Sequence, residues 1–257
     1  ADTSAVEHGF VSMAEDGAGR MALVWLDGRD KAGTALLSTR APREGPVGAE
    51  ERVDGRVCDC CQTALVRTPR GLLAAFRDRS DEEVRDIAIA RFENGAWSAS
   101  QVVAPDGWKI DGCPDAGPSM VAEPNGRLHL AWWTGAEGRA GVRYVSSPDG
   151  GKTWGTPLPL KVGENSKPSH VQIGRQSNGT VYVTWEDGLI KEPAILLATS
   201  RDNGATFEAP ITVSAPGVSA GYPVVSVADR NLAMVWHQAD GALQNSRQVV
   251  ARIGTFR

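Results

Sequence analysis

The hydrophobic positions of the chain fall into short runs, and one type of run recurs at a regular spacing. Each copy is a five-residue apolar segment that ends in an aromatic residue, and the five aromatic residues lie 51, 56, 53 and 51 residues apart. Short apolar runs bounded by Gly, Asn and Asp predict β-strands joined by tight turns. These recurring aromatic anchors are Trp25, Phe76, Trp132, Trp185 and Trp236.

Other short apolar segments surround each anchor and complete a repeating unit of four strands. In the third repeat they are 118–122 before the anchor, and 141–146 and 157–162 after it. A period near fifty residues matches a propeller blade, whereas a two-sheet sandwich would not explain the period and an α-solenoid would show helical periodicity. The sequence therefore predicts an all-β fold, a β-propeller of four-stranded antiparallel blades in a single domain over 1–257, with five visible blades at about 1–55, 56–110, 111–165, 166–217 and 218–257.

The turn between the third and fourth strands carries a specific motif in two consecutive repeats. Residues 147–154 and 200–207 both read Ser-x-Asp-x-Gly-x-Thr-aromatic, and 91–97 is a partial copy. The motif resembles the Asp box of the sialidase-like propellers, which carry the bacterial neuraminidase repeat. Ser and Asp side chains in such a turn cap backbone amides, so we expect a structural role for the box rather than a ligand or calcium site.

Further segments carry the same resemblance along the whole chain. WLDGR, CDCCQT and RDRS are similar to segments of a group of bacterial sialidase-like proteins of unassigned activity, which are often longer at the N-terminus. Catalytic sialidases of this superfamily have six blades, so the five anchors indicate either a five-bladed ring or part of a six-bladed one. Their early Phe/Tyr-Arg-Ile-Pro motif, which supplies the first substrate-binding arginine, is absent from this sequence.

Strand parity brings one set of loops to a common face of the propeller, where we place the candidate site at the mouth of the channel. The resemblance implies an arginine cluster, a Tyr paired with a Glu, and an acidic Asp, because guanidinium groups pair bidentately with a sugar carboxylate. No motif match fixes these residues, and register alone selects them. The candidates are Tyr222, Glu186 and Asp78 for catalysis, with Asp115 as the alternative acid, and Arg29, Arg77, Arg79, His8, His170 and Asp115 for ligand binding, with His237 on the same face.

All four cysteines fall on this face at matching register in two consecutive repeats. Adjacent blades would bring Cys113 near the loop that holds Cys58, Cys60 and Cys61, so in an oxidising compartment we expect at least one disulfide between Cys113 and that loop. The alternative is a thiolate site for zinc or Cu(I), aided by His8 or His170. The Cys-x-Cys-Cys spacing does not match a usual zinc knuckle, so the disulfide is preferred and no cofactor is expected.

Composition and charge exclude several classes of function. The chain has 27 Lys and Arg against 31 Asp and Glu, a net charge of -4, which gives no support to nucleic-acid binding. It contains no apolar run long enough for a membrane span. The sequence begins without Met, consistent with a mature form or a fragment. The resemblance and the expected disulfide together indicate a secreted or periplasmic protein.

Three functions are consistent with these observations. The preferred one is a non-catalytic extracytoplasmic module, an accessory piece of a larger assembly, whose channel mouth binds a glycan or a protein. The second is an exo-α-sialidase, which the resemblance suggests but the missing arginine motif disfavours. The third is a copper- or zinc-binding protein that uses the cysteine cluster.

Overall fold

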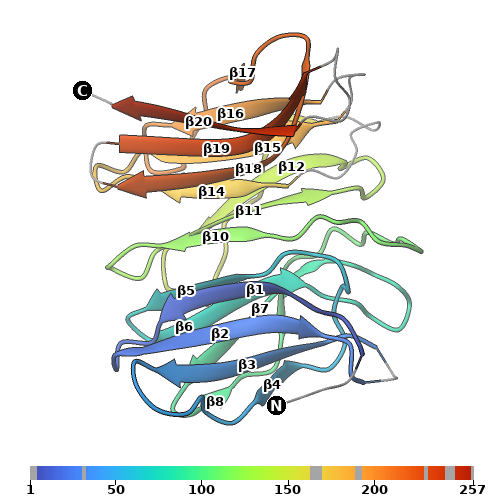
Figure 1. Cartoon of the computed structure of the whole chain (residues 1–257), viewed down its shortest axis with the longest axis vertical. Helices are drawn as coiled ribbons and strands as arrows, with labels where there is room; N and C mark the ends of the chain where they lie inside the picture. The colour runs from blue at the N-terminus through green and yellow to red at the C-terminus, as the bar shows by residue number, and fades with distance from the viewer. Residues whose placement is uncertain are drawn as a thin grey trace. The chain divides into compact units, whose positions relative to one another are not determined.

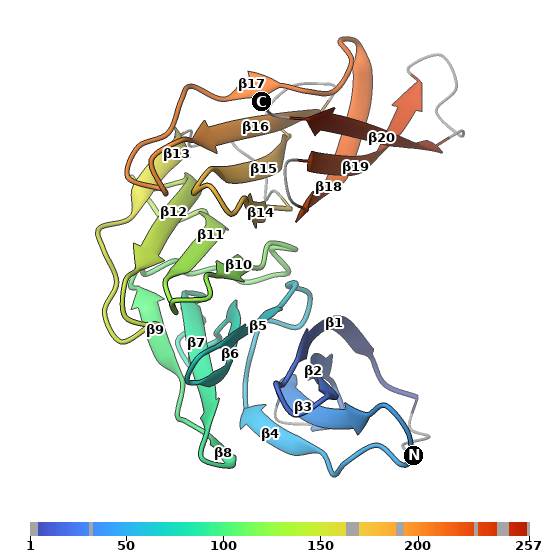
Figure 2. The same ribbon diagram turned by 90° about the vertical axis from the view of Figure 1, so that its left-hand side faces the viewer.

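The chain is built of β-strands throughout the part that the structure describes. The computed structural model describes residues 5–30, 33–162, 170–188, 193–228, 231–240 and 247–255, and these ranges contain no α-helix. Within them no helix is therefore long and apolar enough to cross a membrane. The strands form five antiparallel sheets whose consecutive strands pair as a meander (Figures 1 and 2).

The five sheets follow one another along the sequence, and each is made of consecutive strands. The first holds β1 (His8–Glu15), β2 (Arg20–Asp27), β3 (Ala35–Pro42) and β4 (Glu51–Asp54). The second holds β5 (Ala64–Thr68), β6 (Gly71–Arg77), β7 (Ile87–Glu93), β8 (Ala96–Trp97) and β9 (Gln101–Ala104). The third holds β10 (Ser119–Ala122), β11 (Leu128–Thr134), β12 (Gly141–Ser147) and β13 (Leu158–Val162). The fourth holds β14 (Gln172–Arg175), β15 (Val181–Asp187), β16 (Ala194–Ser200) and β17 (Ile211–Thr212). The fifth holds β18 (Val218–Ala228), β19 (Asn231–Asp240) and β20 (Arg247–Thr255).

This architecture confirms the predicted all-β propeller fold, with two local differences from a uniform four-stranded blade. The outer strand of the second sheet is divided, because β8 and β9 both pair with β7. Asn94 and Gly95 both have positive φ, 56° and 85°, and make a tight hairpin between β7 and β8, as residues of these types favour. The partial Asp-box copy at 91–97 therefore folds as a short hairpin. The fifth sheet has three strands among the described residues.

The protein divides into two compact units. The first unit comprises residues 1–128 and 147–154, and the second comprises 129–146 and 155–257. The first unit contains a cluster of buried apolar side chains that includes Val24, Leu36 and Phe76. The second contains another, which includes Tyr182, Ile195 and Trp236. The anchor Phe76 belongs to the first cluster and the anchor Trp236 to the second. All five anchors are buried except the half-buried Trp25.

The two complete Asp boxes close their turns with their own side chains. In the first, Asp149 accepts hydrogen bonds from the backbone N–H of Thr153 at 2.9 Å and from its hydroxyl at 2.6 Å, while Ser147 accepts the N–H of Gly151 at 2.8 Å. Asp202 binds the N–H and hydroxyl of Thr206 at the same two distances. The contacts are those of a turn-forming device, as the sequence predicts.

Candidate functional site

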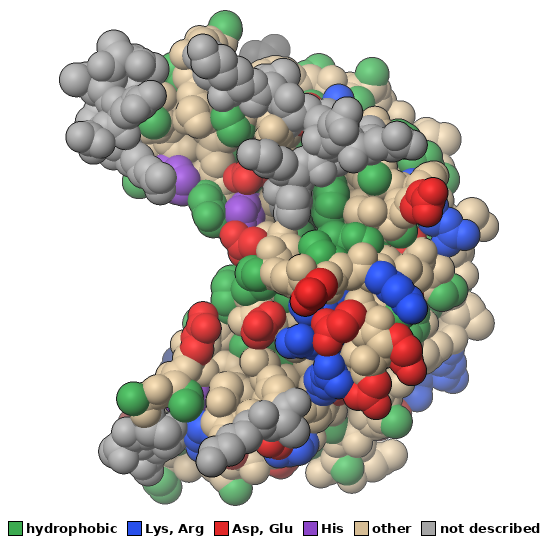
Figure 3. Space-filling view, turned by 90° about the vertical axis from the view of Figure 1, so that its right-hand side faces the viewer, with side chains coloured by type: hydrophobic (Ala, Val, Ile, Leu, Met, Phe, Trp, Pro, Cys, Tyr) green, Lys and Arg blue, Asp and Glu red, His purple; other side chains and the backbone are tan. Residues whose placement is uncertain are grey.

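An aromatic and acidic side-chain group forms on the fourth and fifth sheets of the second unit. We call it the aromatic–acid cluster, and it consists of His170, Glu186, Tyr222 and His237. His170 precedes β14, Glu186 lies at the end of β15, Tyr222 lies in β18 and His237 in β19. In a space-filling view, histidine side chains are seen at the surface beside hydrophobic and acidic ones (Figure 3). Register alone places these four residues on one face, and the structure brings them into contact.

An irregularity in β18 positions Tyr222. The pairing of β18 with β19 shifts between Gly221 and Val224, and Tyr222 between them has a φ of +54°. A positive φ is unfavourable for an aromatic residue, and such strain is typical of functional positions. The bulge turns the Tyr222 side chain outward, where it is 50% exposed.

The Tyr222 ring stacks on His170 and lies tilted beside His237, and the carboxylate of Glu186 contacts both His170 and Tyr222. The Tyr222 ring lies 3.9 Å from the His170 ring and 4.7 Å from the His237 ring between centroids, at interplanar angles of 28° and 32°. Glu186 Oε2 lies 3.1 Å from His170 Nδ1 and accepts a hydrogen bond of 2.8 Å from the backbone N–H of Tyr222. A Cβ on Gly221 would come within 2.9 Å of the same Oε2, so glycine leaves the room that this carboxylate occupies.

The surroundings of Glu186 keep it charged. Burial acts to raise its pKa, but the His170 side chain and the Tyr222 N–H lower it more, and the pKa lies below its usual value. The carboxylate therefore remains an ionised hydrogen-bond acceptor at neutral pH, and it contacts Tyr222 through the tyrosine main chain.

The arginines that the sequence offers as ligand clamps lie in the first unit, and each has partners within it. Arg29 pairs with Asp27 at 2.8 Å and with Glu50 at 2.7 Å, and its side chain is 29% exposed. Asp27 also contacts His8 Nδ1 at 3.1 Å. Burial acts to raise the pKa of Asp27, but hydrogen bonds from Arg29 and Trp25 lower it well below its usual range. His8 and Arg29 thus share one buried carboxylate.

Arg77 is a buried side chain with partners of its own, and its ligand-binding role stays a prediction. It is 1% exposed, and its Nε and Nη1 donate hydrogen bonds of 2.6 Å each to the carbonyl oxygens of Ala116 and Arg85. Its guanidinium lies 4.8 Å from the Trp108 ring centroid. Burial lowers the pKa of Arg77 to about 9, which neighbouring Asp106 and Asp86 oppose. Arg77 therefore connects, through buried hydrogen bonds, the two segments that contain Arg85 and Ala116.

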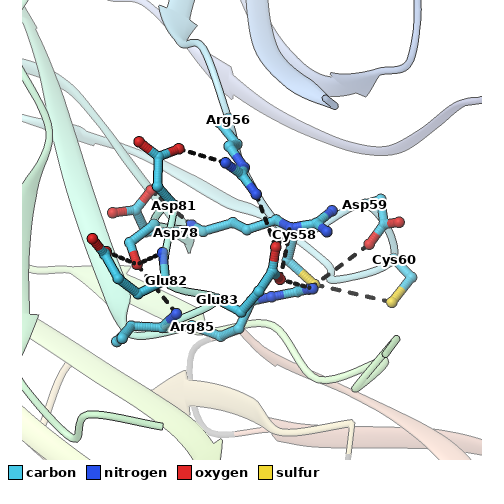
Figure 4. A network of polar contacts seen from close by, with 12 residues as sticks. Arg56, Cys58, Asp59, Cys60, Asp78, Asp81, Glu82, Glu83 and Arg85 are labelled. Carbon is cyan, nitrogen blue, oxygen red and sulfur yellow. Dashed lines mark hydrogen bonds and ion pairs between the residues drawn. The ribbon is translucent and has the colours of Figure 1, made fainter. Parts of the chain in front are cut away.

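Charged side chains that include Arg56, Glu83 and Arg85 form a network around the loop between β6 and β7 (Figure 4). Arg79 joins it through Glu83. The Nε of Arg79 lies 3.0 Å from the carboxylate of Glu83. The same carboxylate forms ion pairs with the guanidinium groups of Arg56 at 2.8 Å and of Arg85 at 2.9 Å. Hydrogen bonds from Arg79 and Arg85 lower the pKa of Glu83 to about 2. Nothing in the sequence pattern distinguishes Glu83 and Arg85 from ordinary loop residues, so sequence reasoning missed them.

The two candidate acids also lie in the first unit. Asp78 is half-buried and accepts the N–H of Arg79 at 2.8 Å. Burial raises its pKa, and Asp54 and Asp86 add to the effect, which is the direction a general acid requires. Asp115 is half-buried with a φ of +47°. Tyr222 and Glu186 belong to the other unit, so the acid role of Asp78 and Asp115 stays a prediction.

The cysteines form two disulfides. Cys60 is bonded to Cys113, with 6.0 Å between their Cα atoms, which is the expected link between Cys113 and the 58–61 loop. A second bond joins Cys58 to Cys61 with a Cα separation of 5.6 Å, so none of the four cysteines is free. The sulfur atoms of Cys58, Cys60 and Cys61 lie within 4.8 Å of one another, as a metal site would require. In the bonded state none of them is a thiolate, so zinc or Cu(I) would need the reduced protein.

Comparison with known proteins agrees with this architecture. A family model described as a BNR repeat-like domain matches residues 70–183. No curated protein sequence matches the chain. A protein of unknown function from Dyadobacter fermentans is similar in structure, with 16% identity and a TM-score of 0.66 over 96% of this chain and 79% of that one.

Two enzymes of known class share the fold. An α-L-arabinanase from Penicillium chrysogenum, solved with arabinobiose, has 12% identity and a TM-score of 0.59 over 94% of this chain and 80% of its own. A Hadza microbial sialidase has 16% identity and a TM-score of 0.52 over 85% of this chain and 52% of its own. Identities this low concern the fold alone.

The chain is thus an all-β protein of the propeller class. The repeat match and these shared folds confirm the predicted resemblance to the sialidase-like β-propeller superfamily.

Proposed function

We propose that this protein is a non-catalytic, extracytoplasmic binding module and that the aromatic–acid cluster is its carbohydrate site. The observation that carries the proposal is the half-exposed Tyr222 ring, stacked on His170 and tilted beside His237, with the carboxylate of Glu186 next to it. A fixed aromatic ring offers an apolar face with a polar tip, and a carboxylate accepts hydrogen bonds from hydroxyl groups. A sugar ring presents both kinds of surface.

Neutral sugars suit this cluster better than sialic acids. A sialoside carboxylate calls for arginines, and Arg175, Arg201 and Arg252 of the same unit contact Asn203, Glu208 and Trp236 respectively. In the first unit, Arg29 and Arg79 are paired with carboxylates and Arg77 is buried. An anionic Glu186 would also repel a sugar acid. The arabinanase of similar fold was solved with a neutral disaccharide, which is consistent with this preference.

Two disulfides favour an oxidising compartment, so we place the protein outside the cytoplasm, secreted or periplasmic. In that setting it would serve as an accessory piece that brings a glycan to a larger assembly.

Binding and hydrolysis can be separated with two substitutions at one position. The full chain is titrated calorimetrically with neutral arabino- and cello-oligosaccharides and with sialyllactose. We expect a neutral oligosaccharide to bind, Tyr222→Ala to weaken binding about fivefold, and Tyr222→Phe to retain it, because stacking on an aromatic ring contributes roughly 1 kcal/mol. Ile211→Ala, at a 60% exposed position on β17, is the matched control and should bind like the parent.

The same proteins are then assayed with a fluorogenic sialoside. Turnover that Tyr222→Phe abolishes would replace the binding proposal with the exo-sialidase alternative, since only a nucleophile needs the phenol oxygen. Failure of every oligosaccharide to bind would also overturn the proposal.

A further inference from the structure

The loop between β4 and β5 of the first unit brings two disulfides together. Cys58 Sγ lies 4.0 Å from Cys60 Sγ, although these atoms belong to different disulfides. Thiol–disulfide exchange proceeds by attack of a thiolate on a disulfide sulfur, so a thiolate at Cys60 would begin within reach of its target.

The solvent exposure of the four cysteines decreases from the outer disulfide to the inner one. Cys113 is exposed, Cys60 is half-buried, and Cys58 and Cys61 are 1% and 2% exposed. An external thiol can therefore reach the Cys60–Cys113 bond at Cys113, whereas the Cys58–Cys61 bond is shielded from direct attack. Electrons from outside would reach the inner pair through Cys60.

A buried cation faces the inner disulfide. Nη1 of Arg85 lies 3.6 Å from Cys58 Sγ, and its side chain is 2% exposed (Figure 4). Its charge is balanced by Glu83 at 2.9 Å and by Asp59 at 3.9 Å, and its Nε has no hydrogen-bond partner among the described residues. During exchange at Cys58, negative charge spreads over the three sulfur atoms in line, and a fixed guanidinium beside the central one stabilises it.

We propose that these four cysteines form a thiol–disulfide exchange site that accepts two electrons from an external dithiol. One thiolate of the dithiol attacks Cys113 Sγ, which forms a mixed disulfide and releases Cys60 as a thiolate. Cys60 attacks Cys58 Sγ, so a Cys58–Cys60 bond forms and Cys61 leaves as a thiolate that takes up a proton. The second thiol of the dithiol then resolves the mixed disulfide, which frees Cys113 as a thiol and oxidises the dithiol to its own disulfide.

The rearranged pairing is the product that identifies this route. The oxidised full chain is treated with less than one equivalent of dithiothreitol, quenched in acid, alkylated and mapped by mass spectrometry. We expect alkylation of Cys61 and Cys113 with a Cys58–Cys60 bond, and no alkylation before the reductant is added. A two-electron product that is alkylated at Cys60 and Cys113, with Cys58–Cys61 intact, would overturn the proposal.

A variant without reductant tests the internal step alone. Cys113→Ser leaves Cys60 as a free thiol beside the inner disulfide, and exchange should place part of the alkylation label on Cys61. Cys60→Ser is the matched control, in which only Cys113 should be labelled. Label confined to Cys60 in Cys113→Ser would contradict the exchange.

Arg85 acts on the reacting sulfur, and its charge can be tested by rescue. Arg85→Gln should slow the appearance of the rearranged product roughly tenfold, whereas Arg85→Lys should recover part of the rate because it keeps a cation there. Equal rates in the parent and Arg85→Gln would remove Arg85 from the mechanism. The wild-type mapping does not depend on the folding of any variant.

Discussion

Tyr222 stacks on His170 with 3.9 Å between the ring centroids, while its backbone N–H binds the carboxylate that contacts the same histidine. His170 contacts the ring of Tyr222 and Glu186 binds its main chain, and these two partners also contact each other. The arrangement of the cluster therefore depends on Glu186 being ionised.

Acid should loosen this cluster. The pKa of Glu186 is lower in the folded protein than in the unfolded chain, so its carboxylate stabilises the fold above the ordinary glutamate pKa of about 4.3. That contribution is lost as the pH falls from there through the lower, folded pKa. Glu186→Gln should melt a few degrees lower at pH 7 and nearly together with the parent below the folded pKa. Melting curves from pH 7 to pH 2.5 measure the difference, and a gap independent of pH would contradict the assignment.

Two glycines with similar backbone angles should respond differently to alanine. Gly204 has a φ of +85° and a Cβ there would collide with the Tyr144 hydroxyl, whereas Gly217 has a φ of +75° with nothing within 4 Å. Gly217→Ala should cost about 1 kcal/mol for the positive φ alone, and Gly204→Ala about 3 kcal/mol or more. Tyr144 Oη also lies 2.6 Å from His129 Nδ1 and is not free to move away. Urea denaturation gives both values, and equal losses would argue against the steric explanation.

Arg77 should matter to stability and not to sugar binding. Arg77→Met removes the donors to two buried carbonyl oxygens, and we expect a loss of about 3 kcal/mol in the free energy of unfolding. Arg201→Met, at an exposed ion pair with Glu208, should cost about 1 kcal/mol or less. Denaturant curves compare the two variants. A ligand affinity that falls in folded Arg77→Met would restore this arginine as a binding residue.

The Asp box of the second unit should show an acid transition at unusually low pH. Hydrogen bonds from the Thr206 hydroxyl and N–H lower the pKa of Asp202 to about 2. The stabilisation by Asp202 is complete above its unfolded pKa of about 3.9 and is lost as the pH falls through the folded value. Asp202→Asn should lower the melting temperature at pH 7 by a few degrees, because an amide nitrogen cannot accept the hydrogen bond that the Thr206 hydroxyl donates. NMR titration of the carboxyl carbon provides the direct measurement, and an ordinary aspartate pKa would refute it.

The recurring anchors were sufficient to predict the sheets, because residues that favour strands and turns locally repeat once in every blade. Trp132, Trp185 and Trp236 mark second strands that the structure also places second in their sheets. Register likewise brought Tyr222, Glu186 and His170 to one face, because strand parity determines which loops share a side. Such reasoning uses only contacts that repeat from blade to blade.

The sequence periodicity did not predict which partners the individual charged residues contact. Arg77 is the last residue of β6 and Arg79 lies two positions further on, yet Arg77 is buried against carbonyl oxygens whereas Arg79 pairs with Glu83. That difference depends on how the following loop folds back, which no periodicity encodes. The Cys58–Cys61 bond was missed for the same reason, since several pairings within the loop satisfy the same spacing.

Each complete Asp box satisfies its backbone amides from within eight consecutive residues, with Ser147 and Asp149 in one copy and Ser200 and Asp202 in the other. The residues of the hairpin are thus sufficient to stabilise its turn. When its coding segment is duplicated, the new copy can form the same turn without a compensating substitution elsewhere in the chain. Such a copied segment would carry its own turn with it, whatever residues stand in the connections at the opposite ends of its strands.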